Sequence, residues 1–336
     1  MILDWLRIFE NTVRAFAGVD AAYFALAAFG LNVQFGYTGL LNFGQAAFMA
    51  CGAYGLGLTS QYFDVSFWWG IPIAMALVVV LALLVGIPTL RLRADYLAIV
   101  TIAAAELVRL VVRSVKFKRI FGGSDGINTF SNEFRALNPF QPSAQYGIWP
   151  FKYSGYTMFT LIIGWTIVAL VAVIVWLLMR SPWGRVVKAI REDEDAVRSL
   201  GKNVYNYKMQ SLIIGGFCGM LSGMIFALDR GSVQPDNYSR DVTFYVLTAL
   251  VLGGLARVMG SIVGPMMFWG VYVFCDNFLR QLVQSKPLRI GDITIIQSTQ
   301  VGAVNYMLVG LGLILLMARR PQGVFGNRQE MALDGR

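Results

Sequence analysis

The chain has 336 residues, of which 57% are hydrophobic and 14% are charged, and its mean hydropathy is +0.60. A soluble domain carries about a quarter charged residues, so this composition excludes an ordinary soluble protein. The net charge of +9 does not indicate nucleic-acid binding, because the basic residues lie in short loops between apolar runs and form no basic stripe with interleaved aromatics.

The N-terminal segment, residues 1–20, mixes Asp4, Glu10 and Asp20 with two arginines, which does not fit a cleavable signal. Nine apolar segments follow, and several reach the roughly 20 residues that a helix needs to cross the hydrocarbon core. They are 21–35, 40–60, 70–90, 96–112, 156–179, 205–228, 242–256, 261–279 and 300–318. Irregular backbone cannot face lipid, so the sequence predicts an all-α fold, a polytopic transmembrane helical bundle in one domain over residues 1–336.

The second apolar segment is unusual because it combines glycines with amides at membrane depth. Gly36, Gly39 and Gly44 break or thin the helix, and Asn42 and Gln45 carry the amides. One interpretation is tight helix packing through small residues. The other is a Gly-broken or re-entrant segment beside a substrate path, as in transporters built from repeats. The candidate path residues are Gly36, Tyr37, Thr38, Gly39, Asn42, Phe43 and Gln45.

Charged residues in and after the fourth segment form two further features. Glu106 and Arg109 lie three residues apart inside the segment, and because an unpaired charge in the membrane is costly, we expect them to pair, as a structural contact or as part of a gate. The loop 113–155, expected to be extracytoplasmic, begins with a basic patch that is either a solvated face or a docking site for a binding protein. This patch is Arg113, Lys116, Lys118 and Arg119.

The loop 181–204 follows a charge-free span and is too long for a turn. Its apolar and charged residues recur at helical spacing, and Gly201 offers a helix C-cap. The sequence therefore predicts a charged cytoplasmic helix between two spans, either a solvated loop helix or a contact for a cytoplasmic motor.

The seventh and eighth segments meet in a second Gly-rich stretch, 250–265. Gly253 and Gly254 are candidates for close helix packing, which the pattern favours, or for the substrate path. Residues 319–336 are expected to form a cytoplasmic tail. Lysine and arginine divide almost evenly between the two sets of loops, so the positive-inside tendency leaves the number of crossings and the side of the N-terminus open.

The 181–204 loop resembles the cytoplasmic coupling loop of ABC importer permeases. The general pattern is Glu-Ala-Ala, three residues and Gly, whereas here Glu194-Asp195-Ala196 is followed by four residues and Gly201. The pattern of the branched-chain amino-acid subfamily, G-R-x-x-x-A-I-R-E-D-E, is similar to residues 184–194. Further stretches that resemble patterns of this subfamily are, in chain order, 36–39 with 42–45, 96–109 with 122–127, 252–265 and 320–326. They cover nearly the whole chain, and the long loop 117–156 resembles the LivM type of this family.

The resemblance implies a permease subunit of the bacterial inner membrane that translocates branched-chain amino acids. It implies a second permease subunit as heterodimer partner, two cytoplasmic ATPase subunits, an extracytoplasmic binding protein and membrane lipid around the chain. The residues that it assigns to ATPase coupling are Gly184, Arg185, Arg191, Glu192, Asp193, Glu194 and Gly201. The chain has no G-x-x-x-x-G-K-[ST] P-loop, so ATP and its magnesium are expected on the partner subunits, and no cofactor or metal is expected here.

Three alternatives remain at this point. A urea or short-amide permease belongs to the same family. A membrane-embedded enzyme would need a cluster of histidines, cysteines or paired carboxylates, but histidine is absent and Cys51, Cys218 and Cys275 lie far apart. A passive channel would leave the charged loop 184–201 unexplained.

Overall fold

The structure, a computed structural model, describes residues 4–62, 66–90, 94–128, 130–141, 144–285, 288–290, 293–296, 300–319 and 323–325. Its α-helices are α1 (Trp5–Phe16), α2 (Val19–Leu31), α3 (Gln45–Tyr62), α4 (Gly70–Thr89), α5 (Ala94–Arg113), α6 (Lys118–Phe121), α7 (Asn132–Ala136), α8 (Gly155–Arg180), α9 (Pro182–Glu192), α10 (Glu194–Ser199), α11 (Val204–Arg230), α12 (Arg240–Gly253), α13 (Val258–Ser285) and α14 (Val301–Arg319). The short strands are β1 (Ile127–Asn128), β2 (Gln145–Tyr146), β3 (Tyr153–Ser154), β4 (Ser232–Val233), β5 (Leu288–Ile290) and β6 (Ile293–Ile296), paired antiparallel as β1–β4, β2–β3 and β5–β6.

The predicted all-α membrane fold is confirmed. Each of the nine apolar segments lies mainly within a helix, and in the described part of the chain five stretches are long and apolar enough to cross a membrane. They are Trp5–Tyr37, Phe67–Thr89, Gly155–Arg180, Val204–Arg230 and Val258–Val283. The first joins α1 to α2, so the N-terminal segment is a helix, and it packs along α13. The chain is a multi-pass membrane protein.

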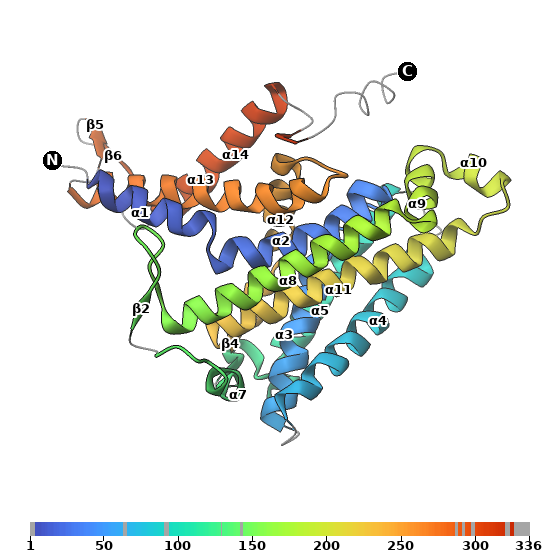
Figure 1. Ribbon diagram of the computed structural model, residues 1–336, viewed down its shortest axis with the longest axis horizontal. Coiled ribbons are helices and arrows are strands. Elements are labelled where there is room, and N and C mark those ends of the chain that lie inside the picture. Colours follow the sequence, from blue (N-terminus) through green and yellow to red (C-terminus); the bar gives the residue numbers. More distant parts are fainter. Residues whose placement is uncertain are drawn as a thin grey trace.

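The helix α2 forms the centre of the bundle. Every residue from Val19 to Leu31 except Asp20 is buried, and α2 packs against α8, α11 and α13 (Figure 1). The outer helices instead carry exposed apolar side chains, such as Leu84 at 68% on α4 and Leu170 at 57% on α8. Apolar side chains exposed on long apolar helices are expected to face lipid.

Small residues bring α11 into backbone contact with α2 and α3. Gly215, Gly219 and Gly223 are four residues apart, so they lie on one face of α11. A Cβ atom on Gly223 would lie 1.9 Å from the carbonyl oxygen of Met49, and one on Gly52 would lie 2.1 Å from that of Met220. A larger residue at either position would separate the helices, so this packing requires glycine.

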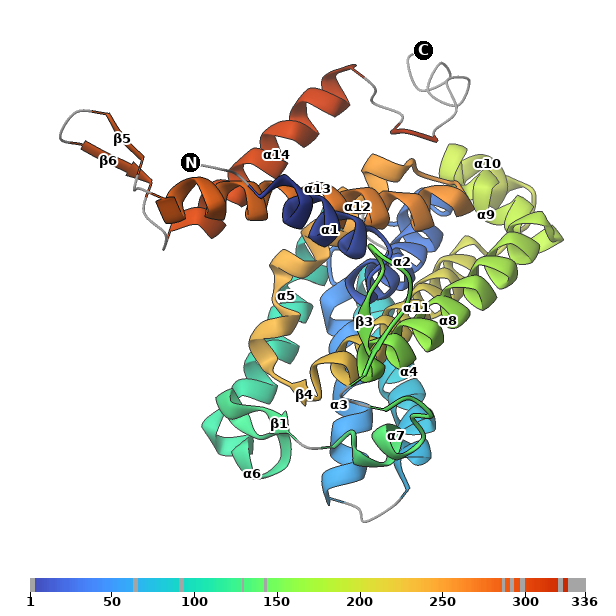
Figure 2. The same ribbon diagram turned by 60° about the vertical axis from the view of Figure 1, so that its left-hand side comes forward.

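Two groups of loops lie at opposite ends of the bundle, and the β5–β6 hairpin projects away from both (Figure 2). At one end, which we call the α9 end, lie α9, α10 and the α12–α13 turn; residues 323–325 pair there with the end of α12 through Val324 N–H to Leu252 O at 3.0 Å. At the other end, which we call the β1–β4 end, β1 of the long loop pairs with β4 after α11. The sequence expects the loop at the α9 end to be cytoplasmic and the loop at the β1–β4 end to be extracytoplasmic.

Candidate functional site

The predicted Gly-broken segment is present, and the break begins earlier than expected. The helix α2 continues directly into η1, a π-helix of six residues (Asn32–Tyr37), and the chain is then irregular until α3 begins at Gln45. π-Helical turns inside helices are rare and occur often at functional sites. The structure therefore places an interruption of regular helix in the most buried part of the bundle.

Amides hold this break together. The side chain of Gln34 donates from Nε2 to Leu212 O at 3.0 Å and accepts at Oε1 from Asn42 Nδ2 at 2.7 Å. The Asn42 Oδ1 atom accepts in turn from Gly44 N–H at 2.8 Å. Because Gln34 and Asn42 are both buried, these bonds satisfy polar groups that lipid could not.

The remaining candidate path residues are also packed by protein. Thr38 is buried and hydrogen-bonds the hydroxyl of Ser211 and, at 2.7 Å, the carbonyl of Val33. Phe43 N–H donates to Thr101 Oγ1 at 3.0 Å, and the Phe43 ring stacks on Phe244 at 5.6 Å. In this conformation the candidate residues line the break without opening it. The partners Gln34 and Ser211 were missed in the sequence, although each is a polar residue in an apolar run.

Gln45 differs from the other amides because half of its amide group has no partner. Its Nε2 donates to Gly215 O at 3.1 Å. Its Oε1 is buried and, among the residues that the structure describes, has no hydrogen-bond partner. A buried acceptor without a donor costs about 1–3 kcal/mol, so this oxygen is available to a donor that another conformation or a ligand supplies.

Asn32 connects the break to the second Gly-rich stretch. Its Oδ1 accepts from Ala256 N–H at 2.8 Å, and its Nδ2 donates to Arg257 O and to Ser261 Oγ, each at 2.9 Å. The two interrupted segments that the sequence singled out are therefore neighbours. Asn32, which makes this connection, was not among the predicted site residues.

Gly253 and Gly254 lie where α12 turns back into α13. A Cβ atom on Gly253 would lie 2.0 Å from the carbonyl oxygen of Gly260, and one on Gly264 would lie 2.0 Å from that of Ala249. Gly254 follows with a φ of 111°, which L side chains rarely adopt. These distances support the packing interpretation of this stretch.

The α9 end contacts the break directly. Arg191 Nη1, from the last turn of α9, donates to the carbonyl oxygen of Gly36 at 2.6 Å. Gly39, with a φ of +74°, lies against the side chain and backbone of the same arginine. Of the residues that the resemblance assigned to coupling, Arg191 is thus the one that reaches the membrane-embedded segment in the described structure.

The 181–204 loop forms two helices where the sequence predicted one. Asp193 is extended, at φ −154° and ψ 104°, and its Oδ1 accepts from Asp195 N–H at 2.9 Å and Ala196 N–H at 3.0 Å. This N-cap starts α10 and ends α9. Gly201, with a φ of +74°, follows the end of α10, as its predicted capping role requires.

The other predicted coupling residues have distinct surroundings. Gly184 sits in the tight α8–α9 corner, where a Cβ atom would lie 2.6 Å from Leu178 O. Glu194 forms ion pairs with Arg198 at 2.9 Å and with Lys208 of α11. Arg185 and Glu192 are exposed, and neither forms an ion pair within the described ranges.

At the β1–β4 end, the predicted Glu106–Arg109 pair is confirmed. Arg109 binds Glu106 through Nη2 at 2.5 Å and also binds Asp236, in the 3₁₀ turn η5 (Pro235–Tyr238), at 2.6 Å. In the predicted basic patch, Arg113 binds the same Asp236 at 3.1 Å and Lys118 binds Asp125 at 2.7 Å. The patch members Lys116 and Arg119 are exposed and form no ion pair with a described residue. The Glu106–Arg109–Asp236 contact ties α5 to the turn before α12.

An open pocket of about 410 Å³, which we call the η5 pocket, lies beside η5. Its polar side carries Arg230, Asp236, Asn237, Ser239 and Asp241. Its apolar side is mainly aromatic and consists of Tyr23, Phe24, Phe226, Tyr245, Phe268, Trp269, Tyr272 and Tyr306, with Met49 of α3 and Val242 of α12. The pocket thus combines charges of both signs with a large apolar wall. The sequence showed these aromatics only as scattered members of separate spans.

Behind this wall, Tyr238 packs edge-on against Phe226 at 5.7 Å. Burial raises the pKa of the Tyr238 hydroxyl well above its ordinary value, so it stays protonated and neutral.

No group of three or more histidine, cysteine or acidic residues suited to a metal ion occurs in the part of the chain that the structure describes.

The chain is similar to known permeases over most of its length. Residues 15–318 match the family described as branched-chain amino acid transport system / permease component. The chain is 30% identical to the high-affinity branched-chain amino acid transport system permease protein LivM of Escherichia coli over 310 residues, which are 90% of this chain and 67% of that protein. It is 25% identical to a probable branched-chain amino acid transport permease protein LivM of Methanocaldococcus jannaschii, over 89% of each chain. By the family match and by this identity, the chain belongs to the permease components of branched-chain amino acid transport systems.

Proposed function

We propose that this chain is a permease subunit of an ATP-driven importer of branched-chain amino acids in the bacterial inner membrane. It would work with a second permease subunit, two ATPase subunits and an extracytoplasmic binding protein. The contact between Arg191 and Gly36 is the observation that carries the proposal. It joins the charged helices α9 and α10, which lie outside the bundle, to the interrupted helix α2–η1 inside it. A permease driven by an external motor needs such a connection.

Movement of α9 would act first on η1. Each backbone hydrogen bond of a π-helix spans one residue more than in an α-helix, so a small displacement of the Gly36 carbonyl can shift the bonding of η1. Asn32, at the start of η1, is bonded to Ala256, Arg257 and Ser261, so the α12–α13 turn would move with it. The break after α2 and the Gly-rich stretch 250–265 would then switch together between two packed arrangements.

The η5 pocket supports an amino acid as the substrate. A zwitterion carries one cation and one anion, and the polar side holds charges of both signs that could exchange partners with it, since Arg230 now pairs with Asp20 at 3.4 Å and Asp236 with Arg109 at 2.6 Å. The aromatic wall suits an aliphatic side chain. Urea is neutral and has no apolar part, so it would use neither feature. Met49 lies one helical turn beyond Gln45, which places the pocket next to the break and its unpartnered amide oxygen.

The test is uptake into proteoliposomes that contain the chain together with its partner subunits. We expect labelled leucine to accumulate when ATP and the binding protein are present, and unlabelled isoleucine and valine to compete. Uptake driven by a non-hydrolysable ATP analogue would indicate a passive channel. Competition by urea but not by valine would indicate the short-amide alternative.

A further inference from the structure

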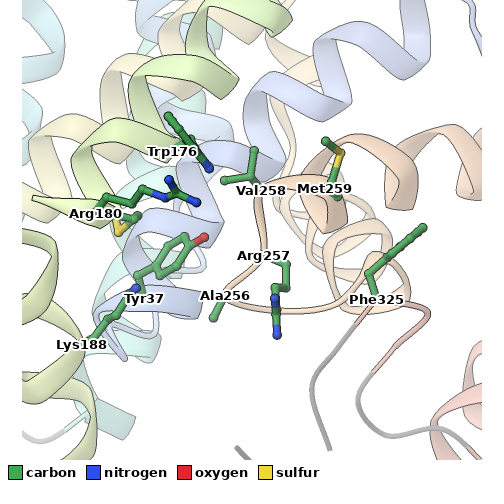
Figure 3. A pocket seen from close by; sticks show the side chains of 10 residues that line it. Tyr37, Trp176, Arg180, Lys188, Ala256, Arg257, Val258, Met259 and Phe325 are labelled. Atoms are coloured by element: carbon green, nitrogen blue, oxygen red, sulfur yellow. The ribbon is translucent and has the colours of Figure 1, made fainter.

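A second pocket lies at the α9 end, with a volume of about 510 Å³. Figure 3 shows Trp176 and Arg180 of α8 together with Tyr37 of η1 on one side, Met259 and Phe325 on the other, and Arg257 and Val258 between them. Lys188 of α9 and Arg257 of the α12–α13 turn complete the charged part of the lining. Four separate parts of the chain thus supply the walls in addition to η1.

The pocket concentrates positive charge without the matching negative charge. Arg180, Lys188 and Arg257 form no ion pair with any described carboxylate, and none of the lining residues is acidic. Two of the three cations instead lie over aromatic rings. Arg180 is 3.9 Å from the ring centre of Trp176, and Lys188 is 5.6 Å from that of Tyr37. Aromatic faces orient a cation but leave its charge for an anion to neutralise.

The walls of the pocket are those of a membrane boundary. Trp176 and Met259 are 43% and 59% exposed and belong to two of the long apolar helices, α8 and α13. Arg180 ends α8 one turn beyond Trp176, an order typical of the boundary between hydrocarbon and headgroups. An acidic side chain of a soluble partner would meet only the charged part of this lining and would leave Trp176 and Met259 uncovered.

From this arrangement we propose that the pocket binds the headgroup phosphate of an anionic phospholipid. The phosphate lies among Arg180, Lys188 and Arg257, and the acyl chains lie along the exposed apolar surface beside Trp176 and Met259. Basic pockets between membrane helices are suited to such headgroups. Bound there, the lipid bridges α9, which carries Lys188, and the α12–α13 turn, which carries Arg257, so its occupancy couples the membrane surface to both moving parts of the proposed transport cycle.

The test measures lipid binding to the full-length chain, purified in detergent with any subunits that co-purify, by native mass spectrometry. Phosphatidylglycerol and phosphatidylethanolamine with identical acyl chains are added in steps. We expect phosphatidylglycerol to bind more tightly, and the variant R180Q/K188Q/R257Q to lose roughly tenfold to a hundredfold in its affinity. The control R7Q/K152Q/K202Q removes the same charge from three exposed residues elsewhere that form no ion pair with a described residue, and it should bind like the wild type.

Two further arms keep the result interpretable. The variant R180K/R257K keeps the charge and should keep the preference for phosphatidylglycerol, which separates loss of the site from loss of folding. Inorganic phosphate and glycerol 3-phosphate, added at millimolar concentration, should not displace the lipid. Equal binding of phosphatidylglycerol by the wild type and R180Q/K188Q/R257Q overturns the proposal, as does displacement by free phosphate, which would indicate a site for a soluble anion. Neither readout depends on transport or on ATP.

Discussion

Arg191 and Gly36 are 155 residues apart in the chain, and the arginine donates a hydrogen bond of 2.6 Å to the glycine carbonyl. Gly36 lies in the last turn of η1, where carbonyls have no donor within the helix, so the end of the helix at the break leaves this oxygen open to α9. The contact joins the charged helix pair to the buried break, and it is the basis of the first prediction.

We expect Arg191→Ala to reduce ATP-driven leucine uptake by roughly tenfold or more, because a hydrogen bond to a charged donor contributes about 1.5–3 kcal/mol. ATP hydrolysis stimulated by the binding protein should fall less than uptake, since the motor would run without moving the break. Both are measured in proteoliposomes, with Lys202→Ala as a control on the same loop. Equal losses in hydrolysis and uptake would show instead that Arg191 is needed for the assembly of the permease with its ATPase subunits.

Glu192 and Glu194 should respond differently to charge reversal. Glu192→Lys should abolish uptake while leaving thermal stability unchanged, because this exposed carboxylate forms no ion pair within the described chain and is free to meet a partner. Glu194→Lys should also lower the melting temperature, because it puts a like charge beside Arg198 and Lys208. Thermal unfolding in detergent and stimulated ATPase activity separate the two effects. Wild-type stimulation in both variants would argue against an ATPase contact here.

Gly223→Ala should destabilise the bundle by about 1–3 kcal/mol, the usual cost of overpacking, because the added methyl would lie 1.9 Å from Met49 O. Gly302→Ala in α14 is the matched control, since no atom lies within 4 Å of the position of its Cβ. The melting temperature of the purified protein should fall only for Gly223→Ala. A similar fall in both would show that the loss of glycine, and not the helix contact, is responsible.

Cysteine introduced at Thr38, Asn42 or Gln45 tests whether the break opens to water. All three positions are buried here, so we expect protection from a water-soluble thiol reagent in the resting complex. Reaction of at least one of them in a nucleotide-trapped complex would indicate that the break borders the transport path. Ser222, buried against Tyr23 O in the middle of α11, offers a control position that should stay protected. Protection of all three in both states would support a purely structural break.

We propose that Lys116 and Arg119 dock the binding protein, because Arg113 and Lys118 of the same patch are already paired with Asp236 and Asp125. K116Q/R119Q should raise the binding-protein concentration that gives half-maximal ATPase stimulation and weaken its salt dependence, since exposed charges are screened within about 10 Å at 0.1 M salt. Basal hydrolysis should not change. If half-saturation and salt dependence both match the wild type, these residues form a solvated face.

The sequence by itself determined the class of fold, the order of the long helices, the presence of the break and the Glu106–Arg109 pair. These depend on local properties, namely apolar runs that must be helical in lipid, glycines that interrupt them, and charges one helical turn apart. Tertiary structure decided the rest, because side chains from distant helices complete each site. Asp236 joins Arg109 from 127 residues away, and Asn32 reaches Ala256 across 224. The split of the charged loop at Asp193 likewise depends on its backbone conformation, since an aspartate within a helical pattern does not reveal that it will cap the next helix.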